Sequence, residues 1–301
     1  MAKEGVENDQ YYTKESVAQL CIDALPFDLN SFSQIIEPSA GRGDFYRLLP
    51  QDISVGVDLD PKTDDLVKSD FFDIDVRVKG PVLTIGNPPF GKNSKLAYEF
   101  FQQSARYSDC IAFIVPKTFR KPSMINRLDR RFHLVHEVVL PEDSFYVEVD
   151  GKIENYSVPC VFQVWLKKTK QLHDSHDWLR GVVRRDLIVQ LTKHEDFEFV
   201  KIKQNPTEQE KQQQCATADF CVRRVGGAAG KVYKDYDEIY RDFKSHYYIK
   251  ENVSGVEKIM SSIEWDVPEN PKYDTAGNPS ISKHELISFY IEQKEKDARE
   301  Q

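Results

Sequence analysis

Short hydrophobic runs follow one another through the first half of the chain, and segments with helical spacing lie between them. The runs have the length and composition of β-strands and cover residues 34–38, 54–59, 81–87, 110–116, 134–141 and 158–166. Residues 94–108 form the clearest helical pattern, and Thr13 is a candidate N-cap for an earlier helix. This alternation predicts an α/β fold, in which parallel strands form an open sheet with its ligand site at their carboxyl ends.

The pattern changes after about residue 167. The polar stretch 203–214 is typical of a solvated loop or linker. Ser282, followed three residues later by Glu285, predicts the capped start of a C-terminal helix. Further strand-like runs lie at 219–227 and 245–251. The sequence therefore predicts a first domain at 1–168 and a smaller, mixed α+β region at 169–301.

Composition and charge narrow the class of protein. With 40% hydrophobic and 30% charged residues the chain is typical of a soluble globular protein, and no apolar stretch reaches the length of a membrane span. The polar N-terminus is unlike a signal peptide, and five cysteines without a C-x-x-C pair favour a reducing, intracellular compartment such as the cytoplasm over secretion. A net charge of −8 argues against a uniformly basic surface but leaves room for a local basic cleft.

A glycine turn follows the first predicted strand, in the sequence EPSAGRGDF at 37–45. Such a turn lets backbone amides approach a ligand closely. Asp58 comes 21 residues after Glu37, at the end of the next strand, where a carboxylate can accept hydrogen bonds from both ribose hydroxyls of a nucleotide-like cofactor. Asp70 could accept from an adenine amino group, and Phe71 could pack on the ring. Alternatively, Asp58 is a surface carboxylate and Phe71 a core residue. The turn lacks the third glycine of the dinucleotide fingerprint, which weakens an NAD interpretation.

The sequence IGNPPFGK at 85–92 is the sharpest feature of the chain. Two prolines fix two φ angles and remove two donors, and the residue before them is pushed towards an extended conformation. The Asn87 side-chain oxygen and the Pro88 carbonyl could then both accept from an –NH2 group, while Phe90 offers an aromatic face to a planar base. Two such bonds would position and polarise a weakly nucleophilic amine without a strong general base. The alternative is a plain Pro-Pro turn that ends a strand.

This ordered set of residues resembles the adenine-amino DNA methyltransferases of the gamma arrangement, as in restriction–modification systems. The resemblance covers about residues 10–166 and implies a Rossmann-like methyltransferase fold, S-adenosyl-L-methionine as the cofactor, S-adenosyl-L-homocysteine as the product and no metal. It implies methyl transfer to the N6 amino group of adenine after base flipping. The cofactor-binding residues that it implies are Tyr11, Thr13, Glu37, Pro38, Ser39, Ala40, Gly41, Gly43, Phe45, Asp58, Asp70, Phe71 and Asn87. The implied catalytic residues are Asn87, Pro88, Pro89 and Phe90, with Phe90 and Phe145 stacking on the base.

The catalytic motif is specific for amino methylation but not for one acceptor. It also resembles the motif of protein glutamine methyltransferases and of the cap-adjacent adenosine methyltransferase of mRNA. An RNA adenine methyltransferase is therefore an alternative to the favoured DNA enzyme, and protein glutamine methylation is a weaker one. A non-catalytic subunit of a methyltransferase assembly is a further alternative, which the intact Asn-Pro-Pro-Phe sequence disfavours.

Two basic clusters are candidates for nucleic-acid contacts. Residues 116–131 contain six basic residues and one acid, a plausible phosphate-binding patch that could also be a solvated face. The predicted contacts there are Lys117, Arg120, Lys121 and Arg127. Arg223, Arg224 and Lys231 flank a glycine turn that lacks the spacing of a P-loop and could be an ordinary β-turn. His133 and His136 are predicted to be structural, because residues three apart on a strand face opposite sides.

Overall fold

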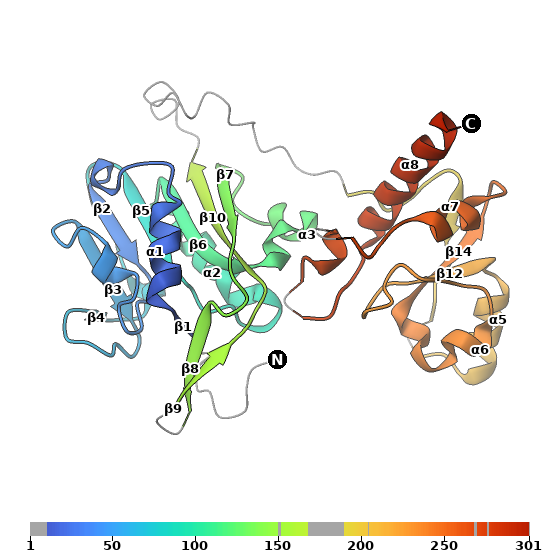
Figure 1. Ribbon diagram of the computed structural model, residues 1–301, viewed down its shortest axis with the longest axis horizontal. Helices are drawn as coiled ribbons and strands as arrows, with labels where there is room; N and C mark the ends of the chain where they lie inside the picture. The colour runs from blue at the N-terminus through green and yellow to red at the C-terminus, as the bar shows by residue number, and fades with distance from the viewer. Residues whose placement is uncertain are drawn as a thin grey trace. The chain divides into compact units, whose positions relative to one another are not determined.

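The chain forms two compact units, residues 1–188 and 189–301 (Figure 1). The computed structural model describes residues 11–149, 152–167, 190–203, 205–267, 270–275 and 277–300. The predicted domain boundary at 168/169 borders the segment 168–189, which lies outside the described residues, so this boundary stays a prediction. Each unit is described below by itself.

A seven-stranded sheet organises the first unit, in the order β4-β3-β2-β5-β6-β10-β7. Strands β4 to β6 run parallel, whereas β10 is antiparallel to both β6 and β7. The strands are β2 (Gln34–Glu37), β3 (Ser54–Asp58), β4 (Val67–Lys68), β5 (Val82–Gly86), β6 (Cys110–Pro116), β7 (Phe132–Val139) and β10 (Cys160–Lys167). All six strands predicted for this unit form, and the predicted architecture, a Rossmann-like α/β sheet flanked by helices with a smaller mixed α+β region after it, is confirmed.

Hydrophobic side chains cover both faces of this sheet. Along β6, Cys110, Ala112 and Ile114 pack into one core, and the alternate residues pack into another. Helix α1 (Glu15–Asp23) contributes to the first core and α2 (Lys95–Ser104) to the second. This period of two on a sheet buried on both sides explains why β6 reads as a continuous apolar run.

The start of α1 corrects one prediction. Lys14 is its N-cap residue and makes no side-chain capping bond. The predicted cap, Thr13, lies instead in β1 (Tyr12–Thr13), where it pairs with Phe145 of β8 (Phe145–Val149). Because α1 begins at Glu15, Thr13 lies one residue before the capping position.

A small sheet of three strands, in the order β1-β8-β9, stands beside the main sheet. Strand β9 (Lys152–Tyr156) pairs antiparallel with β8, so the two form a hairpin inserted in the chain between β7 and β10 (Figure 1). Arg42 of the glycine turn forms an ion pair with Glu148 of the hairpin, and its guanidinium lies 4.8 Å from the centre of the Tyr12 ring. The hairpin therefore holds β1 and the glycine turn.

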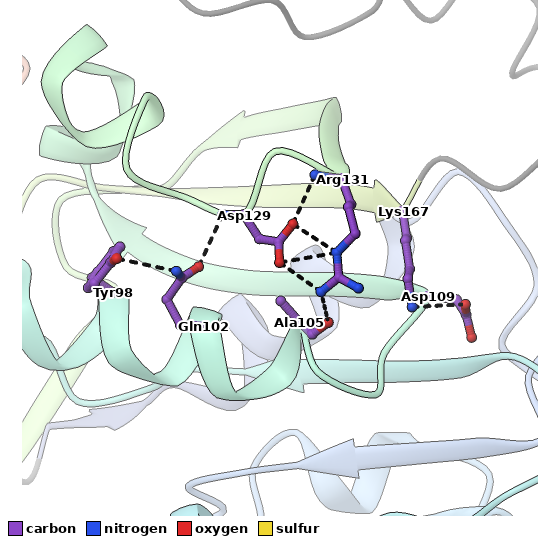
Figure 2. Close-up of polar contacts among 7 residues, drawn as sticks. All are labelled: Tyr98, Gln102, Ala105, Asp109, Asp129, Arg131 and Lys167. Carbon is purple, nitrogen blue, oxygen red and sulfur yellow. Dashed lines mark hydrogen bonds and ion pairs between the residues drawn. The ribbon is translucent and has the colours of Figure 1, made fainter.

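A polar network fixes the end of the segment 116–131 against α2, as Figure 2 shows. The Asp129 backbone N–H donates to Gln102 Oε1 at 3.0 Å. Arg131 donates to Asp129 at 2.7 Å and to the Ala105 carbonyl at 2.9 Å. The Arg131 hydrogen bonds lower the pKa of the Asp129 carboxyl. Arg131 is thus a structural residue in a segment that looks like a free basic patch in sequence.

The second unit holds an antiparallel sheet of four strands, in the order β11-β14-β12-β13. These strands are β11 (Phe197–Phe199), β12 (Phe220–Arg223), β13 (Val232–Tyr233) and β14 (His246–Glu251). Its helices are α5 (Glu208–Ala216), α6 (Tyr236–Ile239), α7 (Val256–Ser262) and α8 (Lys283–Arg299). The predicted capping box of α8 forms between Ser282 and Glu285. The prediction of a loop at 203–214 is wrong, because Thr207 and Glu210 form a second capping box that starts α5.

Two general features concern the described residues of both units. All five cysteines are free thiols, and four of them are buried. No helix in the described part of the chain combines the length and the apolar character needed to cross a membrane.

Candidate active site

A cavity of about 680 Å³ opens where β2, β3 and β5 end, at the carboxyl edge of the main sheet. This volume is within the range of about 300–1,000 Å³ that small-molecule sites occupy. Most of the residues predicted for cofactor and catalysis line it: Tyr11, Thr13, Glu37, Pro38, Ser39, Ala40, Gly41, Phe45, Asp58, Asp70, Phe71, Asn87, Pro88, Pro89 and Phe90. Two predicted residues, Gly43 and Phe145, are not among the lining residues.

The glycine turn and the strand-end acid hold each other. Gly41 has a φ of +54° and donates its backbone N–H to Asp58 Oδ2 at 2.7 Å. Gly43, with a φ of +78°, donates to the Ala40 carbonyl at 2.6 Å. The amides of both glycines are thus used inside the turn, so the turn shapes the cavity wall more than it offers these N–H groups to a ligand.

Asp58 keeps acceptor capacity after these contacts. Its Oδ1 accepts the Asp60 backbone N–H at 2.8 Å and its Oδ2 accepts that of Gly41. Each carboxylate oxygen can accept two hydrogen bonds, so one site on each oxygen is left for a diol. These hydrogen bonds therefore hold the half-buried Asp58 carboxylate in place and leave it able to accept from both hydroxyls of a ribose.

Two carboxyl groups on the wall have raised pKa values. Glu37 is only 2% exposed, and burial, reinforced by the nearby charge of Asp44, raises its pKa well above the ordinary value. Burial also raises the pKa of Asp44, although Arg47 lies 3.1 Å away. Such a pair of desolvated acids favours a cationic ligand, because a positive charge restores the charged form of each carboxyl.

Three buried polar atoms on the cavity wall have no hydrogen-bond partner among the described residues. They are Tyr11 Oη, Glu37 Oε2 and Asn87 Oδ1. An unpaired buried polar group destabilises the folded state by about 1–3 kcal/mol. A wall with three such groups therefore indicates a polar ligand that supplies the missing partners.

The wall also has an apolar part. Phe71 is 2% exposed and stacks on Phe100, with ring centres 5.0 Å apart. Asp70 accepts the Phe72 backbone N–H at 2.9 Å and so caps the short helix at Phe71–Asp73. Leu59 is 64% exposed although it lines the cavity, which makes it an apolar platform for a planar ring.

The sequence interpretation missed eight lining residues: Tyr12, Asp44, Leu59, Asp60, Ser69, Phe72, Leu96 and Phe100. Leu59 directly follows the strand-end acid, and that position was its only signal in the sequence. Asp44 gave no signal beyond its place in the glycine turn.

The loop Asn87–Phe90 presents an acceptor to the cavity. Asn87 Nδ2 donates to the Tyr11 carbonyl at 3.4 Å, and the Asn87 carbonyl accepts from Ser39 Oγ at 3.0 Å. The carboxamide is therefore tethered through its nitrogen, and its oxygen is the unpartnered atom. No described residue donates a hydrogen bond to the Pro88 carbonyl, as two prolines in sequence lead one to expect.

Phe145 does not lie where the resemblance implies. It is 1% exposed, belongs to the hydrophobic core and packs edge-on against Phe90, with ring centres 6.3 Å apart. A ring in this position supports Phe90 from behind and cannot itself stack on a base in the cavity. Phe90 is therefore the aromatic residue of the predicted stacking pair that the cavity exposes.

Several predicted phosphate contacts have other partners. Arg120 donates to Glu137 Oε1 at 2.6 Å in a half-buried ion pair, so it has a partner within its own unit, and its contact with nucleic acid stays a prediction. The Arg127 guanidinium lies 4.4 Å from the centre of the Tyr98 ring. Lys117 and Lys121 are both half-buried.

The basic cluster of the second unit is similarly engaged. Arg223 pairs with Asp242 at 2.9 Å. Arg224 lies over the Tyr247 ring at 5.9 Å, and Lys231 lies over the Tyr233 ring at 4.8 Å. These contacts account for the three cations within their own unit.

No group of three or more His, Cys, Asp or Glu residues that could hold a metal ion occurs among the described residues. No protein-family model matches the chain. No curated protein matches it either.

Some solved structures are similar to about half of this chain. The Pyrococcus horikoshii protein PH1948, provisionally assigned as an RNA methyltransferase, is 17% identical over 56% of this chain and 91% of its own, with a TM-score of 0.40. Protein 1320 of Thermoplasma acidophilum is 18% identical over 52% of this chain and 88% of its own, with a TM-score of 0.37. The 23S rRNA methyltransferase ErmE is 13% identical over 52% of this chain and 69% of its own, with a TM-score of 0.36. TM-scores this low do not transfer an activity, so the function must be argued from the cavity.

Proposed function

We propose that the protein is an S-adenosyl-L-methionine-dependent methyltransferase that methylates the N6 amino group of adenine in a nucleic acid. The observation that carries the proposal is the state of Asn87. Its amide nitrogen is bonded to the Tyr11 carbonyl, its amide oxygen is buried without a partner among the described residues, and Asn87 lines the cavity. A donor on the ligand would satisfy this oxygen, and an exocyclic amino group is such a donor.

The residues present fit the proposed cofactor. The free acceptor sites of Asp58 suit a ribose diol, and Leu59 and Phe71 offer apolar surface to the adenine ring. Glu37 and Asp44, whose raised pKa values a nearby positive charge would lower, suit the ammonium and sulfonium groups of the cofactor. S-adenosyl-L-methionine, when bound, supplies an electrophilic methyl group on a sulfonium sulfur.

Asn87 and Pro88 hold the acceptor in this scheme. Asn87 Oδ1 and the Pro88 carbonyl each accept one hydrogen bond from the acceptor –NH2 group, which fixes its position and draws electron density onto the nitrogen. Phe90 packs on the plane of the base. Hydrogen bonds that strengthen as positive charge develops on nitrogen stabilise the transition state, and one such bond is worth about 10²–10³ in rate. The two carbonyl oxygens also mark the direction in which the surplus proton leaves towards solvent.

Defined oligonucleotides test this proposal. The full-length protein is incubated with labelled cofactor and with DNA and RNA oligonucleotides that contain adenine, and the nucleosides are identified by mass spectrometry. N6-methylated adenine is the expected product. DNA is expected to be the acceptor because of the gamma order of the motifs, and product in RNA alone would select the RNA enzyme. Label in protein only, or on another base, would refute adenine methylation.

The variant Asn87→Ala tests the assigned chemistry. It removes one acceptor of the amino group without touching Asp58 or Glu37, so methyl transfer should fall about 100-fold or more. Cofactor affinity, measured by calorimetry, should stay close to that of the wild type. Retained turnover in this variant would refute the role of Asn87.

A further inference from the structure

We propose that the Tyr11 hydroxyl donates a hydrogen bond to a ring nitrogen of the acceptor base, beside the amino group that Asn87 and Pro88 hold. This inference deepens the proposed function and rests on it for the identity of the base. The family resemblance implies only a cofactor contact for Tyr11, and it assigns no residue to the ring nitrogens. Tyr11 is then the residue that reads the edge of the base.

Tyr11 lines the cavity and carries a buried hydroxyl group. Tyr11 Oη has no hydrogen-bond partner among the described residues, and the same is true of Asn87 Oδ1. A phenol hydroxyl can donate a hydrogen bond, whereas Asn87 Oδ1 and the Pro88 carbonyl can only accept one. The wall thus offers one donor besides two acceptors. A ligand that satisfies all of them must itself carry both a donor and an acceptor.

The small sheet β1-β8-β9 determines which side of the cavity Tyr11 faces. Thr13 pairs with Phe145, and Phe145 pairs with Tyr156, so these three side chains lie on one face of the sheet. Tyr11 lies two residues before Thr13, and its ring stacks on Tyr156 with centres 4.2 Å apart, which places it on the same face. Phe145 of this face packs against Phe90. Tyr11 therefore belongs to the face that meets the catalytic loop.

The opposite face of the small sheet contacts the glycine turn. Tyr12 pairs there with Tyr146, and the Arg42 guanidinium lies 4.8 Å and 6.0 Å from the centres of their rings. The Tyr12 ring also packs on Gly41, where an added Cβ atom would lie 3.3 Å from it. Because successive side chains of a strand point to opposite faces, Tyr12 is directed to the glycine turn and Tyr11 to the catalytic loop.

The backbone of Tyr11 fixes its distance from the acceptor site. The Tyr11 carbonyl accepts a hydrogen bond from Asn87 Nδ2 at 3.4 Å. The unpartnered hydroxyl and the unpartnered amide oxygen therefore belong to two residues in direct contact. The stack on Tyr156 restricts the phenol ring, so the hydroxyl is held at the cavity wall before a ligand arrives.

Adenine carries the matching pair of groups. Its N6 amino group donates hydrogen bonds, and the ring nitrogens N1 and N7 on either side of this group accept them. Two carbonyl oxygens hold the amino group, and the tyrosine hydroxyl donates to the ring nitrogen next to it. Enzymes that take a base out of the stack read it through hydrogen bonds to such an edge. The hydroxyl therefore sets the orientation of the base in the cavity.

Oligonucleotides that contain a single adenine, 1-deazaadenine or 7-deazaadenine test the assignment. Each analogue replaces one ring nitrogen by C–H. Affinity of the full-length protein for each strand, as DNA and as RNA, is measured by fluorescence anisotropy with S-adenosyl-L-homocysteine present, and methyl transfer is measured in parallel. One analogue should bind about 10-fold more weakly than adenine, because it leaves the hydroxyl unpaired. That analogue identifies the nitrogen, and Tyr11→Phe should bind it as well as it binds adenine.

The variants separate the hydroxyl from the fold around it. Tyr11→Phe removes the hydroxyl but keeps the ring that stacks on Tyr156 and the carbonyl that holds Asn87. Tyr146→Phe is the matched control, because it removes a hydroxyl from the opposite face of the same sheet. This control should keep the wild-type difference between adenine and the analogue. Thermal melting of both variants confirms that the fold is intact.

The outcomes separate this inference from the proposed function. Methyl transfer to adenine, with the wild-type difference retained in Tyr11→Phe, would overturn the role of Tyr11 alone. Equal binding of all three strands by the wild type would overturn it as well. A difference that disappears in Tyr11→Phe without any methyl transfer would support the reading of the base and refute the enzyme. Weaker cofactor binding in Tyr11→Phe with the difference retained would place the hydroxyl at the cofactor instead.

Discussion

Replacing Tyr156 by leucine should slow methyl transfer, although Tyr156 does not line the cavity. The Tyr156 ring stacks on Tyr11 with centres 4.2 Å apart and planes at 18°. The Tyr11 carbonyl holds the nitrogen of Asn87 at 3.4 Å. Tyr156 is thus a positioning residue, which acts on the reaction through Tyr11 and the orientation of the Asn87 carboxamide.

The stacked pair sets the size of the effect. Aromatic pairs are worth about 0.5–1.5 kcal/mol beyond the area that they bury. If that energy keeps Tyr11 in the position that tethers Asn87, its loss lowers the population of the competent orientation by about 2- to 10-fold. Asn87→Ala should cost at least ten times more, because it removes the acceptor and not merely its orientation.

The assay is steady-state methyl transfer with separate kcat and KM values for acceptor and cofactor. In Tyr156→Leu, kcat should fall about 2- to 10-fold while the KM for the nucleic acid changes little. Tyr156→Phe keeps the stacked ring and should retain most of the activity. Ile153→Ala is the matched control, since Ile153 lies on the same strand and is 67% exposed.

A second measurement reads the carboxamide itself. The side-chain NH2 resonance of Asn87, labelled with ¹⁵N and assigned by its absence in Asn87→Ala, should shift in Tyr156→Leu and stay in Tyr156→Phe. An unchanged resonance together with unchanged kcat in Tyr156→Leu would refute the positioning role. An equal loss in Tyr156→Leu and Ile153→Ala would show that the hairpin acts only through its general stability.

Two further predictions concern the acids of the cofactor wall. Asp58→Ala should weaken cofactor binding about 10- to 100-fold in calorimetry, since hydrogen bonds to a charged group are worth about 1.5–3 kcal/mol; an unchanged affinity would show that the ribose contact is misplaced. Glu37→Gln should make the ligand-free protein more stable at neutral pH. The raised pKa of Glu37 means that the folded state holds a proton which the unfolded state releases near its ordinary pKa of 4.5. Wild-type stability therefore falls as pH rises above that value. In melting curves at several pH values the variant should lack this decline, and parallel curves would contradict the assignment.

Local patterns in the sequence predict the strands of the main sheet, whereas they predict the elements of the second unit only in part. Continuous apolar runs such as 110–116 can be satisfied only between two helical layers, so their number and spacing predict the architecture. The sequence pattern did not predict strand β4, because this strand has only two residues and both are exposed. Helix α5 was predicted as a loop, because the polar composition of residues 203–214 hides the capping box at Thr207 that starts the helix.

The candidate site could be predicted where the chemistry resides in consecutive residues. Asn87, Asp58 and Glu37 stand at strand ends, and parallel strands bring such ends to one edge. The tether of Asn87 could not be predicted, because it uses a backbone carbonyl, which carries no residue signature. The prediction that Phe145 stacks on the base was wrong for a related reason. An aromatic residue in a strand looks the same in sequence whether it faces the cavity or the core behind Phe90.

The position of the acidic residues in the fold decides what the net charge of the chain implies about its ligands. A value of −8 argues against nucleic-acid binding only if charge is spread evenly. Here Asp58, Asp60 and Asp70 line the cavity where a cationic cofactor is expected, and Lys92 and Lys95 follow the catalytic loop in the sequence. Some of the acids that lower the net charge thus lie at the proposed cofactor site, where they would keep a polyanion away from the cofactor wall. An acidic chain with its acids placed in this way is therefore better suited to place one base at Asn87 than an evenly basic surface, which would hold the strand without a preferred position.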